Sequence, residues 1–236
     1  MPRVLFVIAL CLASFRPAWA LDLVSYKQDG SRKAAARIKN WQEGYHKVPY
    51  IAGSGTLVAI HKDRGLVLTA GHLFKEKVGP ITVEFPDGQV SGARLVSVDH
   101  QLDVAALWIF APKGIQPIPV AGSDPKLDDQ VEIWGYGPKR FRAFVAKVTK
   151  PIAVASDVPD SLIGAVGLEQ KVTIPGDSGG PMIQDGKLVG VHWGYRGADD
   201  DKRRCVHAVG AHRLRSWITA RLGKSVCEEC SPEAGT

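Results

Sequence analysis

The sequence has few of the features that tie a chain to a membrane or a nucleic acid. After the first 20 residues, no run approaches the roughly 20 apolar residues that a spanning helix needs, so we expect a soluble product without a membrane anchor. The net charge is +6, but no basic block carries interleaved aromatic residues, the pattern typical of nucleic-acid binding. The basic excess therefore indicates solvated surface, and we expect no nucleic-acid partner.

The first 20 residues predict a signal peptide. Arg3 is followed by an apolar run over 4–13, and Ala18-Trp19-Ala20 is a small-x-small cleavage site. The run is about half as long as a spanning helix, which favours a cleaved leader over an anchor. We therefore expect residues 1–20 to be removed and the exported chain to begin at Leu21, in a secreted or periplasmic location.

Cysteine is scarce, with 4 in the chain, and Cys11 lies within the predicted leader. Cys205, Cys227 and Cys230 remain, an odd number whose pairing cannot be read from sequence. Export favours a disulfide, which would leave one thiol free or paired between chains. Cys227 and Cys230 have no second ligand pair nearby, so a bridge at the C-terminus is favoured over a metal site. We expect neither a metal nor a cofactor.

Most of the chain consists of short apolar runs with the length and composition of β-strands, separated by turn residues such as Asp, Gly and Pro. They predict strands over 55–60, 66–69, 81–85, 93–98, 104–109, 130–134, 141–148, 165–168, 181–184, 188–192 and 205–209. A Pro-rich connection over 111–119 divides the strands into two sets. A short helix is predicted over 33–41 and a C-terminal amphipathic helix over 212–222. No internal repeat is visible.

Three short motifs carry the groups that nucleophilic catalysis requires. Ser178 lies at the centre of the turn Pro-Gly-Asp-Ser-Gly-Gly-Pro, His72 follows Leu-Thr-Ala-Gly, and Asp103 precedes the apolar run Val-Ala-Ala-Leu. A serine hydroxyl is a poor nucleophile near neutral pH, so it needs a base to accept its proton and a third group to orient that base. The sequence supplies a candidate for each part.

These motifs, in the order His, Asp, Ser, resemble those of the trypsin/chymotrypsin-like serine proteases, and the resemblance extends from about Gly53 to Leu222. It implies an all-β fold of two six-stranded antiparallel β-barrels with a C-terminal α-helix, and an active site in the cleft between the barrels. The expected domains are an N-terminal segment over 21–49, barrels over 50–119 and 120–211, and a helix and tail over 212–236.

The resemblance also implies roles for single residues. His72 would be the general base for Ser178, and Asp103 would fix the tautomer of His72. Asp99 and His100 are rivals for the third position, but neither is followed by the apolar strand that carries the family's aspartate. The implied activity is that of a monomeric serine endopeptidase that cleaves polypeptides through an acyl-enzyme.

The turn around the serine carries two further implications. The backbone amides of Gly176 and Ser178 would form the oxyanion hole. In many relatives a new amino terminus, made by cutting a pro-segment, inserts beside the aspartate that precedes the nucleophile, here Asp177. The usual Ile-Val-Gly-Gly start is absent, so we expect either Leu21 or a nearby basic side chain to pair with that carboxylate, since a buried unpaired charge is costly.

The specificity pocket departs from that of trypsin. An Asp six residues before the nucleophile would select Arg or Lys, but that position is Val172. The usual Ser-Trp-Gly wall is replaced by His192-Trp193-Gly194, and Thr173 lies five residues before the nucleophile, which together resemble the bacterial glutamyl endopeptidases. An imidazole and a hydroxyl can bind a carboxylate, so we expect cleavage after Glu or Asp, with the backbone of Trp193 and Gly194 pairing with the extended substrate.

Alternatives remain open at this point. His192 could instead bond to the backbone, with a pocket that takes small apolar residues. The chain could also be a catalytically silent module that keeps the fold and captures peptides, or an esterase with the same triad. Nothing in the sequence suggests a lipid-binding lid, which disfavours the esterase.

Overall fold

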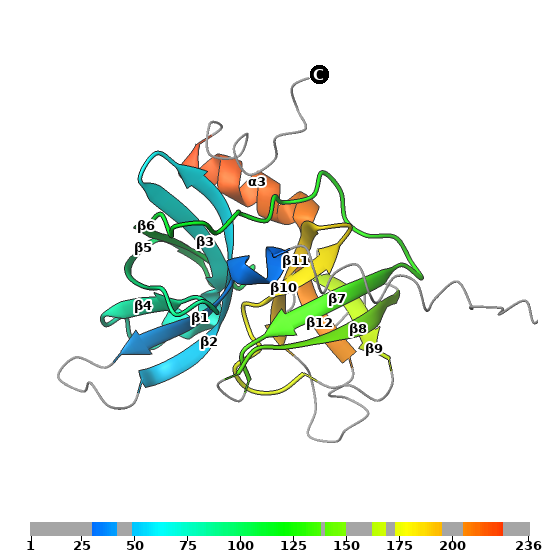
Figure 1. Cartoon of the computed structure of the whole chain (residues 1–236). Helices are drawn as coiled ribbons and strands as arrows, with labels where there is room; N and C mark the ends of the chain where they lie inside the picture. Colours follow the sequence, from blue (N-terminus) through cyan, green and yellow to red (C-terminus); the bar gives the residue numbers. More distant parts are fainter. Residues whose placement is uncertain are drawn as a thin grey trace, which may run out of the picture. The chain divides into compact units, whose positions relative to one another are not determined.

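The computed structural model describes residues 30–41, 49–137, 140–149, 162–168, 173–194 and 205–223. In this part of the chain, twelve strands form two closed β-barrels, and one α-helix follows them (Figure 1). The first barrel contains β1 (Ala35–Trp41), β2 (Pro49–His61), β3 (Arg64–Ala70), β4 (Ile81–Glu84), β5 (Val90–Asp99) and β6 (Val104–Phe110). The second contains β7 (Gln130–Gly135), β8 (Arg142–Thr149), β9 (Leu162–Gly167), β10 (Pro181–Gln184), β11 (Lys187–Gly194) and β12 (Cys205–Gly210).

Both barrels have the same strand order. The first runs β1-β2-β3-β6-β5-β4 and the second β7-β8-β9-β12-β11-β10, and every pair of neighbouring strands within them is antiparallel. One topology therefore occurs twice, although the sequence shows no repeat. The predicted all-β fold, with two six-stranded antiparallel barrels and a C-terminal helix, is confirmed.

Each barrel is filled by the side chains that its strands turn inward. The largest fully buried ones in the first barrel include Ile38, Leu57 and Leu107, and those in the second include Trp134 and Met182. Burying one such side chain contributes about 1.5–3 kcal/mol. Closure also pairs the strands that would otherwise be edges, so the barrels hold the loops at their ends on a rigid frame.

The predicted helix over 33–41 is wrong. A short 3-10 helix, η1 (Ser31–Ala34), leads directly into strand β1, and the first barrel begins at β1 rather than at residue 50. Burial in β1 follows the two-residue period of a strand, with Ala36, Ile38 and Asn40 inward. Pairing with β2 and β4 on either side overrides the helix propensity of the alanines.

The connection between the barrels is bound to both of them. The Ile118 amide donates to the Leu57 carbonyl (2.9 Å), and the Leu188 amide donates to the Pro119 carbonyl (2.9 Å). Helix α3 (Ala211–Leu222) then follows β12 and buries Leu214, Trp217 and Ile218 as predicted, whereas Leu222 is half-buried. No helix among the described residues is long and apolar enough to cross a membrane.

Candidate active site

His72 and Asp103 lie together at one end of the first barrel. Ala70, the last residue of β3, pairs with Val104, the first residue of β6, so the residues just beyond these two strand ends are neighbours. His72 follows in a 3-10 helix, η2 (Gly71–Phe74), and its Nδ1 lies 2.7 Å from Asp103 Oδ2. The His72 backbone amide donates to the other oxygen of the same carboxylate (2.5 Å). Two contacts therefore fix the imidazole relative to Asp103.

The backbone at Asp103 is in the left-handed region, with φ of 56°. Such a conformation is uncommon for a residue with a side chain and costs about 1–3 kcal/mol. The residue is 5% exposed, and the contacts of its carboxylate with His72 offset the strain. Asp99 has a different task, because its Oδ1 accepts the amides of Gln101 and Leu102 (3.0 Å each) and closes the turn that leads to Asp103. Asp103, not Asp99, contacts the histidine.

Ser178 belongs to the second barrel, and its loop packs against the first. The Ser178 carbonyl accepts the Ser54 amide of β2 (2.7 Å). The next residue, Gly179, has φ of 85°, and a Cβ there would lie 2.7 Å from the Ala70 amide nitrogen. Only glycine allows that approach to the end of β3. The loop thus brings Ser178 to the barrel end that carries His72.

Ser178 Oγ and the His72 ring are not hydrogen-bonded to each other in this structure, although the structure describes both residues. The His72 side chain is 35% exposed and Ser178 is half-buried, so solvent reaches both. In enzymes generally, hydrogen bonds between catalytic groups are often long without substrate and shorten when the substrate binds.

The amides of the serine loop divide into two groups. Those of Asp177, Gly179 and Gly180 donate to the carbonyls of Ile174 (3.1 Å), His192 (2.7 Å) and Asp177 (3.0 Å). Within the described part of the chain, the Gly176 and Ser178 amides have no acceptor. Gly176 has φ of 99°, which favours glycine there. Two unused donors therefore flank Asp177 beside the candidate nucleophile.

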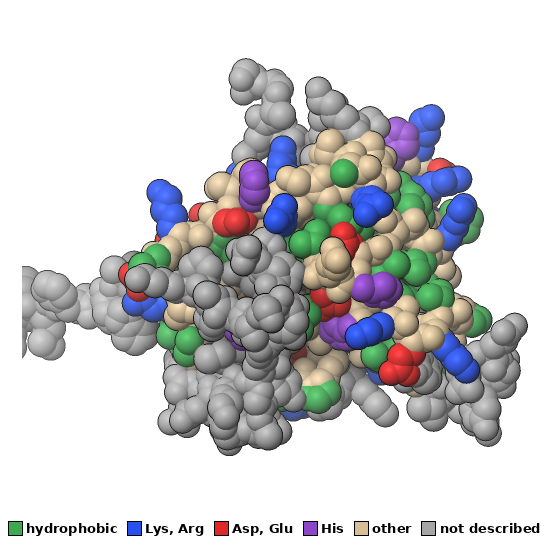
Figure 2. Space-filling model, turned by 180° about the vertical axis from the view of Figure 1, so that it is seen from behind, with side chains coloured by type: hydrophobic (Ala, Val, Ile, Leu, Met, Phe, Trp, Pro, Cys, Tyr) green, Lys and Arg blue, Asp and Glu red, His purple; other side chains and the backbone are tan. Residues whose placement is uncertain are grey.

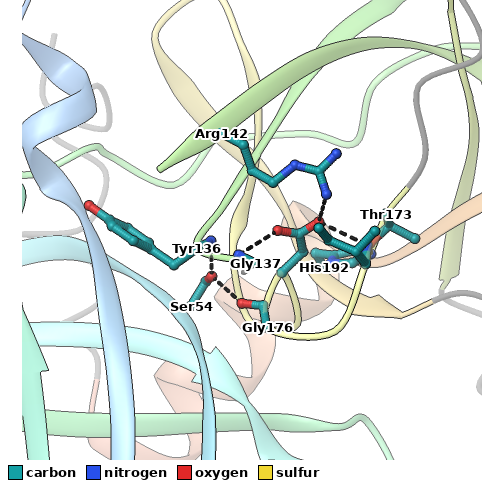
Figure 3. A network of polar contacts seen from close by, with 9 residues as sticks. Ser54, Tyr136, Gly137, Arg142, Thr173, Gly176 and His192 are labelled. Atoms are coloured by element: carbon teal, nitrogen blue, oxygen red, sulfur yellow. Dashed lines mark hydrogen bonds and ion pairs between the residues drawn. The ribbon is translucent and has the colours of Figure 1, made fainter. Parts of the chain in front are cut away.

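Ser54 was not among the residues chosen from the sequence, yet its side chain joins the two barrels. Its Oγ donates to the Gly176 carbonyl (2.7 Å) and accepts the Tyr136 amide (2.9 Å), and the residue is 1% exposed (Figure 3). The Tyr136 hydroxyl also donates to the Ala35 carbonyl of β1 (3.2 Å). Nothing in the local sequence signals this role, because every partner lies far away along the chain.

Thr173 and His192, two residues of the predicted specificity pocket, are in contact. Thr173 Oγ1 lies 3.1 Å from His192 Nε2, and both residues are buried (Figure 3). His192 Nδ1 has no hydrogen-bond partner among the described residues. Burial lowers the pKa of His192 below its ordinary value, and the nearby charge of Asp177 opposes this shift. A neutral, fully buried imidazole therefore lies directly behind the serine loop.

The remaining predicted pocket residues fall at the edge of what the structure describes. Trp193 and Gly194 end β11, where the register shifts between His192 and Gly194, so Trp193 has no partner residue in β12. The ring of Trp193 packs edge-on against that of His207, with centroids 6.2 Å apart. Val172, Leu21 and the predicted bridge at Cys227 and Cys230 lie outside the described residues.

Asp177 is paired with a basic side chain, one of the two partners expected from the sequence. Arg142 Nη1 donates to Asp177 Oδ2 (3.1 Å).

No group of three potential metal-ligating side chains occurs in the described ranges. On the face that Figure 2 shows, Lys and Arg side chains stand apart among acidic and apolar ones rather than in one block.

The chain is similar in sequence and in fold to known peptidases. A family model described as "Trypsin-like peptidase domain" matches residues 53–191. The chain is 27% identical over 146 residues to the periplasmic pH-dependent serine endoprotease DegQ of Escherichia coli, covering 59% of this chain and 31% of that protein. It is 37% identical over 123 residues to Trypsin Blo t 3 of Blomia tropicalis, covering 44% and 46%. The Rv3671c protease from M. tuberculosis, in its active form, aligns with a TM-score of 0.65 at 24% identity, covering 82% of each chain.

The chain spans about a third to a half of the length of these two curated relatives. The likeness to the solved protease supports the fold. The region that the family model matches begins in β2 and ends in β11, so it includes all three residues His72, Asp103 and Ser178. On this match, the chain belongs to the trypsin-like peptidase family.

Proposed function

We propose that this chain is a serine endopeptidase in which Ser178 is the nucleophile, His72 the general base and Asp103 the residue that orients His72. The observation that carries the proposal is the double contact of Asp103 with His72, through the ring and through the backbone amide. That contact fixes the tautomer with a proton on Nδ1, which leaves Nε2 free to accept a proton from serine.

The reaction would proceed by acyl transfer. Ser178 Oγ forms a bond to the scissile carbonyl carbon while His72 Nε2 takes the hydroxyl proton, and the same proton then passes to the leaving amine as the peptide bond breaks. Water, activated by His72, hydrolyses the ester. Asp103 holds the ring of His72 and stabilises the imidazolium that forms.

The oxyanion that develops on the carbonyl needs donors already in place. The unused amides of Gly176 and Ser178 support that role, since the other amides of the loop have acceptors of their own. Losing one such donor typically lowers the rate by about 10²–10³. The backbone of Trp193 and Gly194 at the end of β11 would pair with an extended polypeptide substrate and so orient the scissile bond.

We infer a preference for Glu, and for Asp, before the cut. The contact between Thr173 and His192 supports it, because it brings a hydroxyl and an imidazole together as the sequence resemblance requires. A carboxylate that enters the pocket would raise the pKa of the buried His192 and draw a proton onto it. Binding of an acidic side chain is then linked to proton uptake, so the preference for Glu over Gln should grow as the pH falls.

We also propose that residues 1–20 are an export signal and that the protease works in the periplasm or outside the cell. The composition of that segment supports the proposal, as does the periplasmic location in the name of the DegQ relative. A disulfide at Cys227 and Cys230 would fit the same compartment. The mass of the exported protein should correspond to a chain that starts at Leu21.

Active-site labelling tests the catalytic assignment. A peptidyl phosphonate should label the wild-type protein at one residue, Ser178, and should not label Ser178→Ala. Wild type should also release the amine from a peptide amide. A silent peptide-binding module would neither react nor turn over, and an esterase would cleave simple esters but not amides, so either result would overturn the proposal.

Cleavage-site profiling tests the specificity. A peptide library digested with wild type should be enriched in Glu and Asp before the cut, and His192→Ala should lose this enrichment while still reacting with the phosphonate. The ratio of kcat/KM for matched Glu and Gln substrates should rise between pH 8 and pH 6 only in wild type. An absence of acidic residues before the cut would contradict the assignment of Thr173 and His192.

A further inference from the structure

Asp177 is a buried negative charge beside the proposed nucleophile. The residue is 1% exposed, and its carboxylate accepts hydrogen bonds from the amides of Gly137 (3.1 Å) and Ile174 (3.0 Å) (Figure 3). Hydrogen bonds from neutral groups do not cancel a buried charge, which needs a cation close by. Arg142 supplies that cation through Nη1, 3.1 Å from Oδ2.

The framework of the second barrel holds Arg142 in place. Arg142 is the first residue of β8 and pairs with Gly135 of β7. Gly135 in turn packs on the aspartate, because a Cβ there would lie 2.5 Å from Asp177 Oδ1. The guanidinium also lies over the ring of Phe144, 5.8 Å from its centroid, and the side chain is only 24% exposed. Residues of β7 and β8 therefore hold the guanidinium against Asp177.

The ion pair bears directly on the loop that would carry out catalysis. Asp177 lies between Gly176 and Ser178, whose amides are the proposed oxyanion donors. Its bond to the Ile174 amide and the bond from its own amide to the Ile174 carbonyl close the turn over 174–177. Ser54 holds the Gly176 carbonyl from the other side. If Asp177 turned away, both donors would move.

We propose that Arg142 is a positioning residue that holds the 174–178 loop in its active conformation, and that it takes the place of the charged amino terminus that pairs with this aspartate in many relatives. The consequence is a protease that needs no cut upstream of η1 to become active. The inference rests on the proposed function, since it assigns a task to Arg142 only if Ser178 acts on peptides.

Charge replacement at Arg142 is the first test. Arg142→Gln should lower the phosphonate labelling rate of Ser178 and kcat by about 10²–10³, the loss typical of a missing oxyanion donor. Arg142→Lys should recover at least about tenfold of that loss, because the described contact uses one nitrogen and an ammonium can replace its charge. The matched control is Arg37→Gln, which removes another partly buried arginine from an ion pair, with Glu84, in the first barrel.

The pH profile separates this role from a purely structural one. Among the residues that the structure describes, the titratable groups that face Asp177 are Arg142 and His192, and burial lowers the pKa of His192, so it titrates on the acidic side. Burial also raises the pKa of the neighbouring Tyr136 phenol, which stays neutral. The labelling rate should therefore stay level from about pH 8 to pH 10, the range in which a chain-terminal amine loses its proton. A fall across that range in the still-folded protein would contradict the inference.

A blocked amino terminus completes the experiment. The chain from Leu21 onward, carrying an uncleaved N-terminal tag, should react with the phosphonate as fast as the chain from which the tag has been removed. Reaction of the trimmed form alone, or an Arg142→Gln variant as reactive as wild type, would overturn the role of Arg142 and leave the triad intact. Failure of both wild-type forms to react would instead refute the proposed function.

Discussion

Asp103 and Asp99 are a pair of carboxylates four residues apart with separate tasks. Asp103→Asn should lower kcat by about 10⁴, because an amide in that position favours the wrong tautomer of His72. Asp99→Asn should keep activity within about tenfold of wild type, since Asp99 only accepts two backbone amides in the turn. Steady-state hydrolysis of one peptide amide by the two variants measures the difference. A larger loss of kcat in Asp99→Asn than in Asp103→Asn would contradict the assignment of the catalytic role to Asp103.

Ser54 and Thr56 offer a matched comparison for stability. Both are buried hydroxyls in β2, but Ser54 Oγ makes two hydrogen bonds to the second barrel, whereas Thr56 Oγ1 has no partner among the described residues. Ser54→Ala would leave the Gly176 carbonyl and the Tyr136 amide unsatisfied, so the free energy of unfolding should fall by about 1–3 kcal/mol. Thr56→Val should be neutral or stabilising. Denaturant unfolding measures both values, and equal losses would contradict the assigned role of Ser54.

At the scale of elements, strand β1 closes the first barrel by pairing with β2 on one side and β4 on the other. Ile38→Gln should reduce the free energy of unfolding by at least about 2 kcal/mol, because it removes a fully buried apolar side chain and buries an amide. The next residue, Lys39, faces outward and forms an ion pair with Glu84. Lys39→Gln removes that ion pair and should lower the free energy of unfolding by no more than about 1 kcal/mol. Similar losses at the two positions would contradict the alternating burial of β1. Thermal unfolding of the two variants decides between these structures.

The elements that sequence could predict are those whose signal is local. Eleven of the twelve strands in the described part of the chain were expected, because turn residues and apolar runs mark them within a few positions. Strand β1 was missed because its partners, β2 and β4, decide its conformation and its alanines favour a helix. The same limit applies to the site. Local motifs single out His72, Asp103 and Ser178 as candidates, whereas the contacts of Ser54 with Gly176 and of Arg142 with Asp177 span 122 and 35 residues.

At the scale of the whole molecule, the junction between the barrels depends on groups that are buried away from water. Asp177 is neutralised by Arg142, but His192 has no acidic side chain among its described hydrogen-bond partners. Folding therefore places an imidazole where its protonated form is disfavoured. The free energy of unfolding should consequently depend on pH through His192, in addition to the ordinary effect of carboxylates at lower pH.

The sign of this dependence follows from the direction of the shift. In the unfolded chain a histidine titrates near about pH 6.5, whereas burial lowers the pKa of His192 in the folded protein. Below about pH 6.5 the unfolded chain binds a proton that the folded protein rejects, so the free energy of unfolding falls as the pH falls, and above that pH it is unaffected. Denaturant unfolding measures how far the free energy of unfolding falls between pH 7.5 and pH 5. This fall should be smaller for His192→Gln than for wild type, because the glutamine can keep the contact with Thr173 and does not titrate. An equal fall in variant and wild type would mean that His192 is already protonated in the folded state. The proton uptake proposed for the binding of acidic substrates would then be absent.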